Sequence, residues 1–328
     1  MRFILRRVGM FVFTLWAALT LNFFIPRFMP GNPLQDLIAK GHGKISAQAM
    51  ADMLASFGYK QNENGFQQYF AYLGNMLTGH WGVSLTVAPG ASIRQMVLGA
   101  LPWTLGLIGV TTVLAFLAGT VIGIVAGWRR GGFVDSVLPT TFVVTTALPY
   151  FVVGMLLIEI FSVTNHWLPN DYTYDYTIVP GLSPGFVGSV LQHALLPAAA
   201  LMVTSIGGWI LTMRNNMITT LAEDYIRMGR AKGLSNRKIM YGYAARNAML
   251  PNLSGFAMSL GFVLSGAVLV EWVFNYQGVG YMLLNAVDSS DYPLMQALFM
   301  LYTVAVLVAI LASDFVMLRL DPRARAKG

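Results

Sequence analysis

The sequence has no cysteine and few charged residues, and both absences narrow the class of protein. Without Cys, the 328-residue chain can form neither a disulfide framework nor a thiolate metal site. Charged residues make up 11% of the chain, whereas soluble globular domains carry about 25%. Hydrophobic residues make up 56%, and the mean hydropathy is +0.60. Because the apolar residues form long uninterrupted runs, we predict an all-α membrane protein.

Six segments are long and apolar enough to cross a bilayer, which requires about 20 mostly apolar residues. These predicted spans are 8–28, 101–127, 136–164, 190–213, 252–273 and 294–318. The third contains Pro139 and Pro149, which predict a tilt or kink. The first is long and has no small-residue cleavage site after it, so we interpret it as an uncleaved span rather than a signal peptide.

The distribution of Lys and Arg predicts that both termini lie in the cytoplasm. In this orientation sixteen of the 21 basic residues are inside. The outer loops 165–189 and 274–293 contain no Lys or Arg at all. The net charge of +7 is therefore explained by membrane topology and contact with membrane lipid, and we do not expect nucleic-acid binding.

The chain divides into four predicted parts. An N-terminal transmembrane helix, 1–28, precedes segment 29–97, which is too polar to span a membrane and is predicted to be an extracytoplasmic insertion. Within the insertion, 46–57 and 66–77 have the apolar spacing of short helices. A core of five transmembrane helices, 98–318, contains a charged cytoplasmic loop, 214–251, and a short cytoplasmic tail, 319–328, follows.

The cytoplasmic loop 214–251 has the most specific residue order in the chain. Helix formers from Ala222 to Lys232 predict a short helix that Gly233 ends. Composition alone would also suit a basic loop on lipid headgroups. The informative strings are Asp-Tyr-Ile-Arg at 224–227, Ala-Lys-Gly-Leu-Ser at 231–235 and Arg-Asn-Ala-Met-Leu-Pro at 246–251. Their order resembles the EAA loop of binding-protein-dependent ABC importers, in particular the dipeptide/oligopeptide permease family.

The resemblance extends along nearly the whole chain. Further similar strings are Pro30-Gly31-Asn32-Pro33, Trp81-Gly82-Val83-Ser84-Leu85, Leu101-Pro102-Trp103-Thr104-Leu105, Asp291-Tyr292-Pro293 and Asp321-Pro322-Arg323. Two positions depart from the pattern: Gly229 stands where the family more often has alanine, and Gln277 where it usually has proline. The resemblance implies six transmembrane helices in the bundle of a type I (MetI-like) ABC importer permease.

In that family the first helix of the loop docks on an ATPase subunit. The resemblance carries this role to Glu223, Asp224, Tyr225, Arg227, Ala231, Lys232, Gly233, Leu234 and Ser235. It also implies a homologous second permease subunit, two ATP-binding subunits, an extracytoplasmic substrate-binding protein and a place in the bacterial plasma (inner) membrane. ATP and Mg would be used by the partner subunits, so we expect this chain to be non-catalytic and without a cofactor. Peptides are the first expected substrate, with oligosaccharides and nickel chelates as alternatives.

The fifth predicted span contains candidate residues for packing or for the transport pathway. Ala257, Gly261 and Ser265 recur every four residues, a spacing that lets helices approach closely in lipid. Static helix packing and a role in the pathway both remain open for these residues. Glu271 ends the span on the outer side and could face the substrate entrance.

Three other functions agree less well with the sequence. The string 181–185 matches Gly-x-Ser-x-Gly, but no strand precedes Ser183 and no acid separates it from the last histidine, His193. The closest string to a phosphate-binding loop, 41–45, lacks its first glycine and its hydroxyl, so this chain is not expected to hydrolyse ATP. A secondary transporter would explain the spans but not the ordered loop, and no inverted repeat is evident.

Overall fold

The computed structural model describes residues 2–28, 64–261, 263 and 268–320. Within these ranges the regular structure is helical, apart from one antiparallel bridge between Val83 and Ser92. The prediction of an all-α protein is therefore confirmed. The chain forms two compact units: Met1–Trp103 with Gln277–Val308, and Thr104–Tyr276 with Ala309–Gly328.

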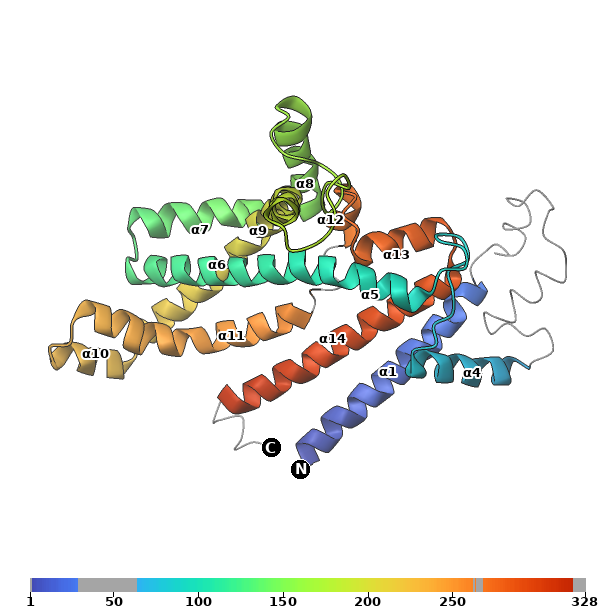
Figure 1. Cartoon of the computed structure of the whole chain (residues 1–328). Helices are drawn as coiled ribbons and strands as arrows, with labels where there is room; N and C mark the ends of the chain where they lie inside the picture. Colours follow the sequence, from blue (N-terminus) through green and yellow to red (C-terminus); the bar gives the residue numbers. More distant parts are fainter. Residues whose placement is uncertain (1, 29–63, 262, 264–267, 321–328) are drawn as a thin grey trace. The chain divides into compact units, whose positions relative to one another are not determined.

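The first unit packs the N-terminal helix against α4, which lies in the predicted insertion, and against the last long helix. Its helices are α1 (Arg2–Phe28), α4 (Gly65–Thr78), most of α5 (Ile93–Thr104), α13 (Val279–Asp288) and the first part of α14 (Tyr292–Leu320). The Asn22 amide on α1 donates to the Tyr72 hydroxyl on α4 at 3.0 Å and to the Gln296 carbonyl on α14 at 2.8 Å. Figure 1 shows α1 running beside α14. The predicted helix at 66–77 is thus confirmed, and the one at 46–57 lies outside the described residues.

A fully buried carboxylate, that of Asp291, holds the loop that precedes α5. Oδ2 of Asp291 accepts hydrogen bonds from the Ser84 hydroxyl and from the backbone N–H groups of Leu85, Thr86 and Val87. The three N–H distances are 2.9, 3.0 and 3.1 Å. Asp291 also begins the turn into α14, where its Oδ1 accepts from the Leu294 N–H. One side chain therefore stabilises the loop through four donors, and charge-assisted bonds of this kind are stronger than neutral ones.

The second unit contains the helices that surround the candidate site. In chain order they are η1 (Leu105–Gly109), α6 (Val110–Trp128), α7 (Phe133–Thr146), α8 (Tyr150–Ile158), η2 (Glu159–Thr164), α9 (Pro184–Leu221), α10 (Asp224–Ala231), η3 (Lys238–Ala245), α11 (Arg246–Gly261) and α12 (Val268–Val273). Three of these, the η elements, are π-helical. Ser183 caps α9 by accepting a hydrogen bond from the Phe186 N–H at 3.3 Å, so the Gly-x-Ser-x-Gly string is a helix start.

A glycine stripe on α6 brings this helix into close contact with α9. A Cβ added at any of its three positions would lie only 2.5–2.7 Å from a Cβ atom of α9. The glycines and the α9 residues they face are Gly119 with Trp209, Gly123 with Met213, and Gly127 with Met217. Real Cβ atoms do not approach within 3.0 Å, so no larger residue fits these positions without separating the helices. The stripe therefore fixes α6 and α9 as one closely packed pair.

Four helices among the described residues are long and apolar enough to span a membrane. They are Leu5–Phe24, Ile93–Trp128, Pro184–Leu221 and Tyr292–Phe315. A fifth span is present if α7 and α8 count together, because they form a pair bent by 95° at a short break that ends at Pro149. The predicted kink is therefore found at Pro149, whereas Pro139 lies inside α7. The predicted span 252–273 includes residues outside the described ranges, so the count of six stays a prediction.

Candidate functional site

Helix α10 is a short helix on the predicted cytoplasmic loop, and it ends where the sequence indicated. It runs from Asp224 to Ala231, and Gly233 follows with a φ of +72°. The Gly233 N–H donates to the Arg230 carbonyl at 2.9 Å, and the Leu234 N–H donates to the Gly229 carbonyl at 3.2 Å. These bonds close the helix end with glycine in the left-handed conformation, which costs other residues free energy.

One side of α10 is anchored and the other is exposed. Ile226 is 1% exposed and packs in a cluster with Met217 of α9 and Ile239 of η3. Of the nine predicted docking residues, only Leu234 is half-buried, and the other eight are exposed. Among these, Tyr225 is 38% exposed, and Met228, which is outside the predicted set, is 60% exposed. An exposed face of basic and apolar side chains on a helix fixed from behind is suited to contact with another protein.

The polypeptide after α10 leads back into the membrane as one helical run. From Asn236 the chain is helical through η3 and α11, and Pro251 lies inside α11. The part of the loop that follows Gly233 therefore forms a helix that continues directly into α11 and the predicted fifth span. In Figure 1, α10 lies at the end of the unit where α6 turns into α7.

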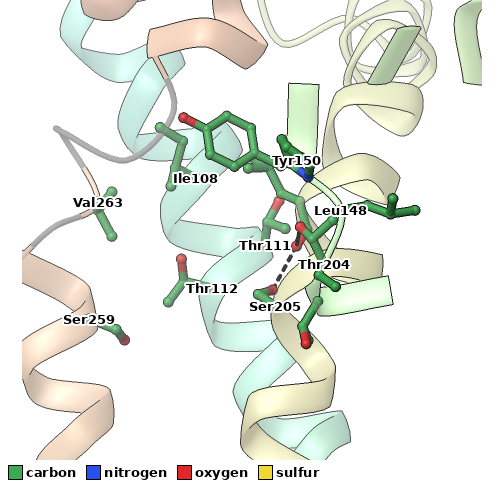
Figure 2. A pocket seen from close by; sticks show the side chains of 13 residues that line it. Ile108, Thr111, Thr112, Leu148, Tyr150, Thr204, Ser205, Ser259 and Val263 are labelled. Carbon is green, nitrogen blue, oxygen red and sulfur yellow. Dashed lines mark hydrogen bonds between the residues drawn. The ribbon is translucent and has the colours of Figure 1, made fainter. Parts of the chain in front are cut away.

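A central cavity of about 490 Å³ lies where the α7–α8 break meets α9, α11 and the start of α6. Its lining residues are Ile108, Thr111, Thr112, Thr146, Ala147, Leu148, Pro149, Tyr150, Leu201, Thr204, Ser205, Ser259 and Val263. Figure 2 shows hydroxyl side chains from several helices around this space. Non-helical backbone at membrane depth is tolerated where it lines a cavity, and broken helices often mark transporter binding sites. The break at 147–149 satisfies that condition.

The cavity lies near the middle of the spans that line it. Leu201–Ser205 are central in Pro184–Leu221, and Ile108–Thr112 are central in Ile93–Trp128. None of the thirteen described lining residues is Asp, Glu, Lys, Arg or His. A pocket of this size, apolar with a few polar groups, is typical of small-molecule sites.

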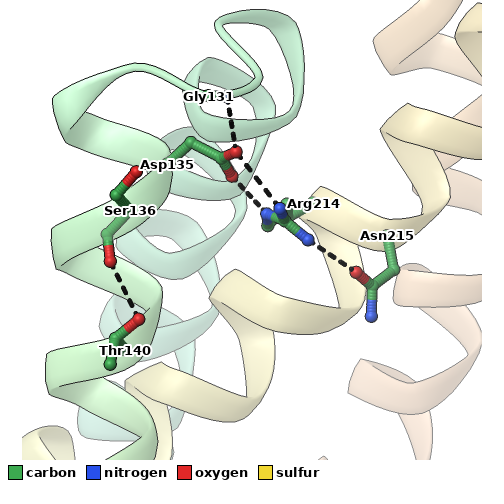
Figure 3. Close-up of polar contacts among 6 residues, drawn as sticks. All are labelled: Gly131, Asp135, Ser136, Thr140, Arg214 and Asn215. Atoms are coloured by element: carbon green, nitrogen blue, oxygen red, sulfur yellow. Dashed lines mark hydrogen bonds and ion pairs between the residues drawn. The ribbon is translucent and has the colours of Figure 1, made fainter.

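An ion pair joins the α6–α7 turn to α9, and sequence reasoning did not single it out (Figure 3). The Arg214 guanidinium contacts both carboxylate oxygens of Asp135, with Nη2 donating to Oδ2 at 3.2 Å. The Gly131 N–H donates to the same oxygen at 2.8 Å. Asp135 is buried, so the guanidinium compensates a carboxylate that would be costly alone. The two residues lie 79 positions apart, so no local sequence pattern connects them.

The loop before α9 and the first turns of α9 line a second, open cavity of about 690 Å³. Its tyrosines pack edge to face: Tyr176 contacts Tyr172 and Tyr174, and Tyr174 contacts Phe186 of α9. Hydrogen bonds from the backbone N–H and hydroxyl of Thr177 hold the pKa of Asp175 below its usual range. The contact between Tyr174 and Phe186 joins the loop to the start of α9, whereas Tyr172 and Tyr176 remain exposed.

The remaining predicted pathway residues do not gather at the central cavity. Ala257 is half-buried in α11, and Gly261 is the last residue of that helix. The contribution of α11 to the cavity lining is Ser259, and Ser265 lies outside the described residues. Glu271 is fully buried and its Oε1 accepts a 2.6 Å hydrogen bond from Thr104, so it lies within the packing of its own unit.

These features define a class: a helical membrane protein with an uncharged cavity at mid-span and an exposed, anchored helix on a loop between spans. The chain belongs to the family described as binding-protein-dependent transport system inner membrane component, which matches residues 119–326. That range contains the whole of loop 214–251. The predicted family resemblance is confirmed, and the chain is a multi-pass component of an inner-membrane transport system.

Three relatives align over nearly the full length of both chains. The di/tripeptide transport system permease protein DppB of Pseudomonas aeruginosa is 32% identical, over 98% of each chain. The oligopeptide transport system permease protein AppB of Bacillus subtilis is 30% identical, also over 98% of each. The glutathione transport system permease protein GsiC of Salmonella choleraesuis is 31% identical over 100% of each. A transport permease is therefore the right class, and the hydrolase and secondary-transporter alternatives are set aside.

Proposed function

We propose that this chain is the transmembrane permease subunit of an ATP-driven importer and forms half of a pathway for peptides. The three relatives are named for transport of di- and tripeptides, oligopeptides and glutathione. The central cavity supports the same substrate class, because its volume is in the range that holds a small organic solute. Oligosaccharides and nickel chelates are the alternative substrates.

The observation that carries the proposal is the state of α10, which is exposed on one face and anchored on the other. Its contact face, Glu223 to Ser235 without the buried Ile226 and Gly229, would lie on an ATP-binding subunit. Ile226 in turn packs against Met217 on α9, and α9 lines the cavity. A displacement of α10 by the ATPase would therefore reach the cavity wall through one continuous helix.

The complete machine would hold this chain, a homologous permease, two ATP-binding subunits and an extracytoplasmic binding protein. Both termini and α10 would face the cytoplasm of a bacterial cell, and the tyrosine-rich loop would face outward. ATP and Mg would be consumed by the partner subunits, and this chain would supply no catalytic residue. Directional import requires that ATP and the loaded binding protein both favour the same outward-open state.

The natural absence of cysteine makes this proposal directly testable, because any introduced cysteine is the only one in the chain. Met228→Cys places a thiol on the exposed face of α10, and Tyr241→Cys is a matched control at a similarly exposed residue of η3. In the purified complex, cross-linking to the ATP-binding subunit is expected from position 228 and not from 241. Equal cross-linking from both, or none from 228 in a complex that hydrolyses ATP, would refute the docking assignment.

Orientation and substrate have their own readouts. Leu182 in the outer loop is 97% exposed, so Leu182→Cys should react with a membrane-impermeant thiol reagent added outside intact cells. If the cysteine at position 182 reacted only after the cells were lysed, the predicted orientation in the membrane would be wrong. Reconstituted complex should take up radiolabelled tripeptide with ATP. Uptake of an oligosaccharide or a nickel chelate in its place would overturn the substrate assignment.

A further inference from the structure

The central cavity has a chemical character that its residue types alone do not reveal. Four of its hydroxyl groups donate their single proton to a carbonyl of their own helix. Thr204 donates to Ala200 at 2.9 Å and Ser205 to Leu201 at 2.7 Å. Thr111 donates to Leu107 at 2.5 Å, and Ser259 to Phe256 at 2.8 Å. These bonds use the donor of each group and leave its oxygen lone pairs available.

Four hydroxyl groups of the cavity lining therefore present hydrogen-bond acceptors to the space rather than donors. Two further hydroxyls of the lining, those of Thr112 and Tyr150, make no side-chain hydrogen bond to another described residue. No charged side chain balances the acceptors. A solute in this space satisfies the hydroxyl oxygens only if it brings its own N–H or O–H groups, because unsatisfied polar groups at this depth are costly.

We propose that these acceptors bind the backbone N–H groups of a peptide in transit, so that selection rests on the main chain rather than on side chains. This inference rests on the proposed function and names the part of the substrate that the site recognises. Every peptide residue except proline presents one backbone N–H, whatever its side chain. Thr112 and Tyr150 supply donors for the peptide carbonyls. An uncharged lining leaves cationic and anionic side chains without a specific partner to trap them.

Weak recognition of this kind suits a pathway. A hydrogen bond between neutral groups contributes less to binding than a hydrogen bond to a charged group. Transport requires binding that is strong enough to admit a solute and weak enough to release it. Several neutral acceptors meet both conditions, and a lysine or aspartate in the same place would hold oppositely charged peptides.

The test compares two peptides and two permease variants in the complete reconstituted transporter. The peptides are trialanine and its analogue with both amide nitrogens methylated, which lacks the internal N–H donors. Thr204→Val removes one acceptor from the cavity with little change of shape. Thr212→Val is the matched control, because Thr212 lies on the same helix, donates to Gly208 at 2.8 Å, and is absent from the cavity lining.

The binding protein can itself discriminate between the two peptides, so the measured quantity is a ratio that is compared between permeases. For each permease we take uptake of trialanine divided by uptake of the methylated analogue. Thr204→Val, combined with Ser205→Ala, should lower this ratio by about fivefold or more relative to the unaltered permease, as expected for two lost neutral hydrogen bonds. Thr212→Val should leave the ratio unchanged, which also controls for expression and folding.

Two results would overturn the inference. In the first, the double variant slows uptake of both peptides by the same factor, which would make the hydroxyls packing groups only. In the second, Thr212→Val changes the ratio as much as the double variant. Failure of the proposed function looks different: the unaltered complex would then import neither peptide with ATP.

Discussion

Two adjacent glycines on α9 have opposite surroundings, and they provide a sharp test of how α7 packs there. A Cβ added at Gly207 would collide with the carbonyl oxygen of Phe142 and lie 2.8 Å from both its carbonyl carbon and Cγ2 of Thr146. A Cβ added at Gly208 would meet no atom within 4 Å. We therefore expect Gly207→Ala to be destabilising and Gly208→Ala to be neutral or stabilising.

The size of the effect follows from which atoms must move. Two of the colliding atoms at Gly207 are α7 backbone, which cannot rotate away as a side chain could. Forcing the helices apart costs about 1–3 kcal/mol, and a gap of about 0.5–1 Å forfeits a quarter to a half of the dispersion energy of each contact. At Gly208 alanine instead gains about 1 kcal/mol in helix propensity. Alanine at Gly207 gains the same helix propensity, so the two variants should differ by the packing cost alone, about 1–3 kcal/mol.

The assay is equilibrium unfolding of the purified chain in mixed micelles with increasing SDS, followed by far-UV circular dichroism. Gly207→Ala should unfold at a lower SDS fraction than the unaltered chain, and Gly208→Ala at an equal or higher one. Because Thr146 also lines the cavity, Gly207→Ala should reduce ATP-driven uptake as well. Equal unfolding midpoints for the two variants, or a larger loss for Gly208→Ala, would refute the packing described for α7 and α9.

Three further predictions concern other contacts. Gly233→Val should abolish uptake without preventing membrane insertion, because a φ of +72° is strongly unfavourable for a β-branched residue. Gly229→Ala should keep uptake, because its added Cβ makes an ordinary 3.7 Å contact with Leu234. Loss of uptake in Gly229→Ala would contradict this prediction. Asp291→Ala should lower the free energy of unfolding by about 3 kcal/mol or more, because three backbone N–H groups lose their acceptor. It should also make the loop before α5 sensitive to added protease. Protease resistance equal to that of the unaltered chain would show that Asp291 does not hold this loop. Asp135→Asn should lower the free energy of unfolding in the SDS assay by about 1–3 kcal/mol, a figure discounted for the partial exposure of Arg214. The double variant with Arg214→Gln should lose less stability than the sum of the two single variants. Strict additivity would show that the pair does not interact.

The sequence predicted most of the helices, including the short helix α10 and its end, because these depend on local signals. Long apolar runs locate spans, and Gly233 ends α10 because it alone tolerates the left-handed conformation there. The kink at Pro149 was also predictable, since proline removes a helix donor. These features need only residues within a few positions of one another.

The central cavity could not be predicted, because its walls are brought together by tertiary packing. Thr111, Tyr150, Thr204 and Ser259 lie on four different helices, and nothing in their local sequence marks them as neighbours. The glycine stripe on α6 has the same four-residue spacing as Ala257, Gly261 and Ser265. Spacing alone did not show which stripe faces a partner helix, and the structure shows that the α6 stripe does so.

The length of α9 gives the α6–α9 pair a mechanical consequence. At about 1.5 Å per residue, its 38 residues make a rod of about 57 Å, nearly twice the roughly 30 Å of a bilayer core. Its end next to α10 lies about 24–30 Å from the cavity residues Leu201–Ser205. Because the interlocked glycines stop α6 from sliding along it, the pair can act as a stiff lever. A tilt of about 10° about the cavity residues would then move the α10 end of α9 by roughly 4–5 Å. A small displacement of α10 would in this way change the width of the central cavity.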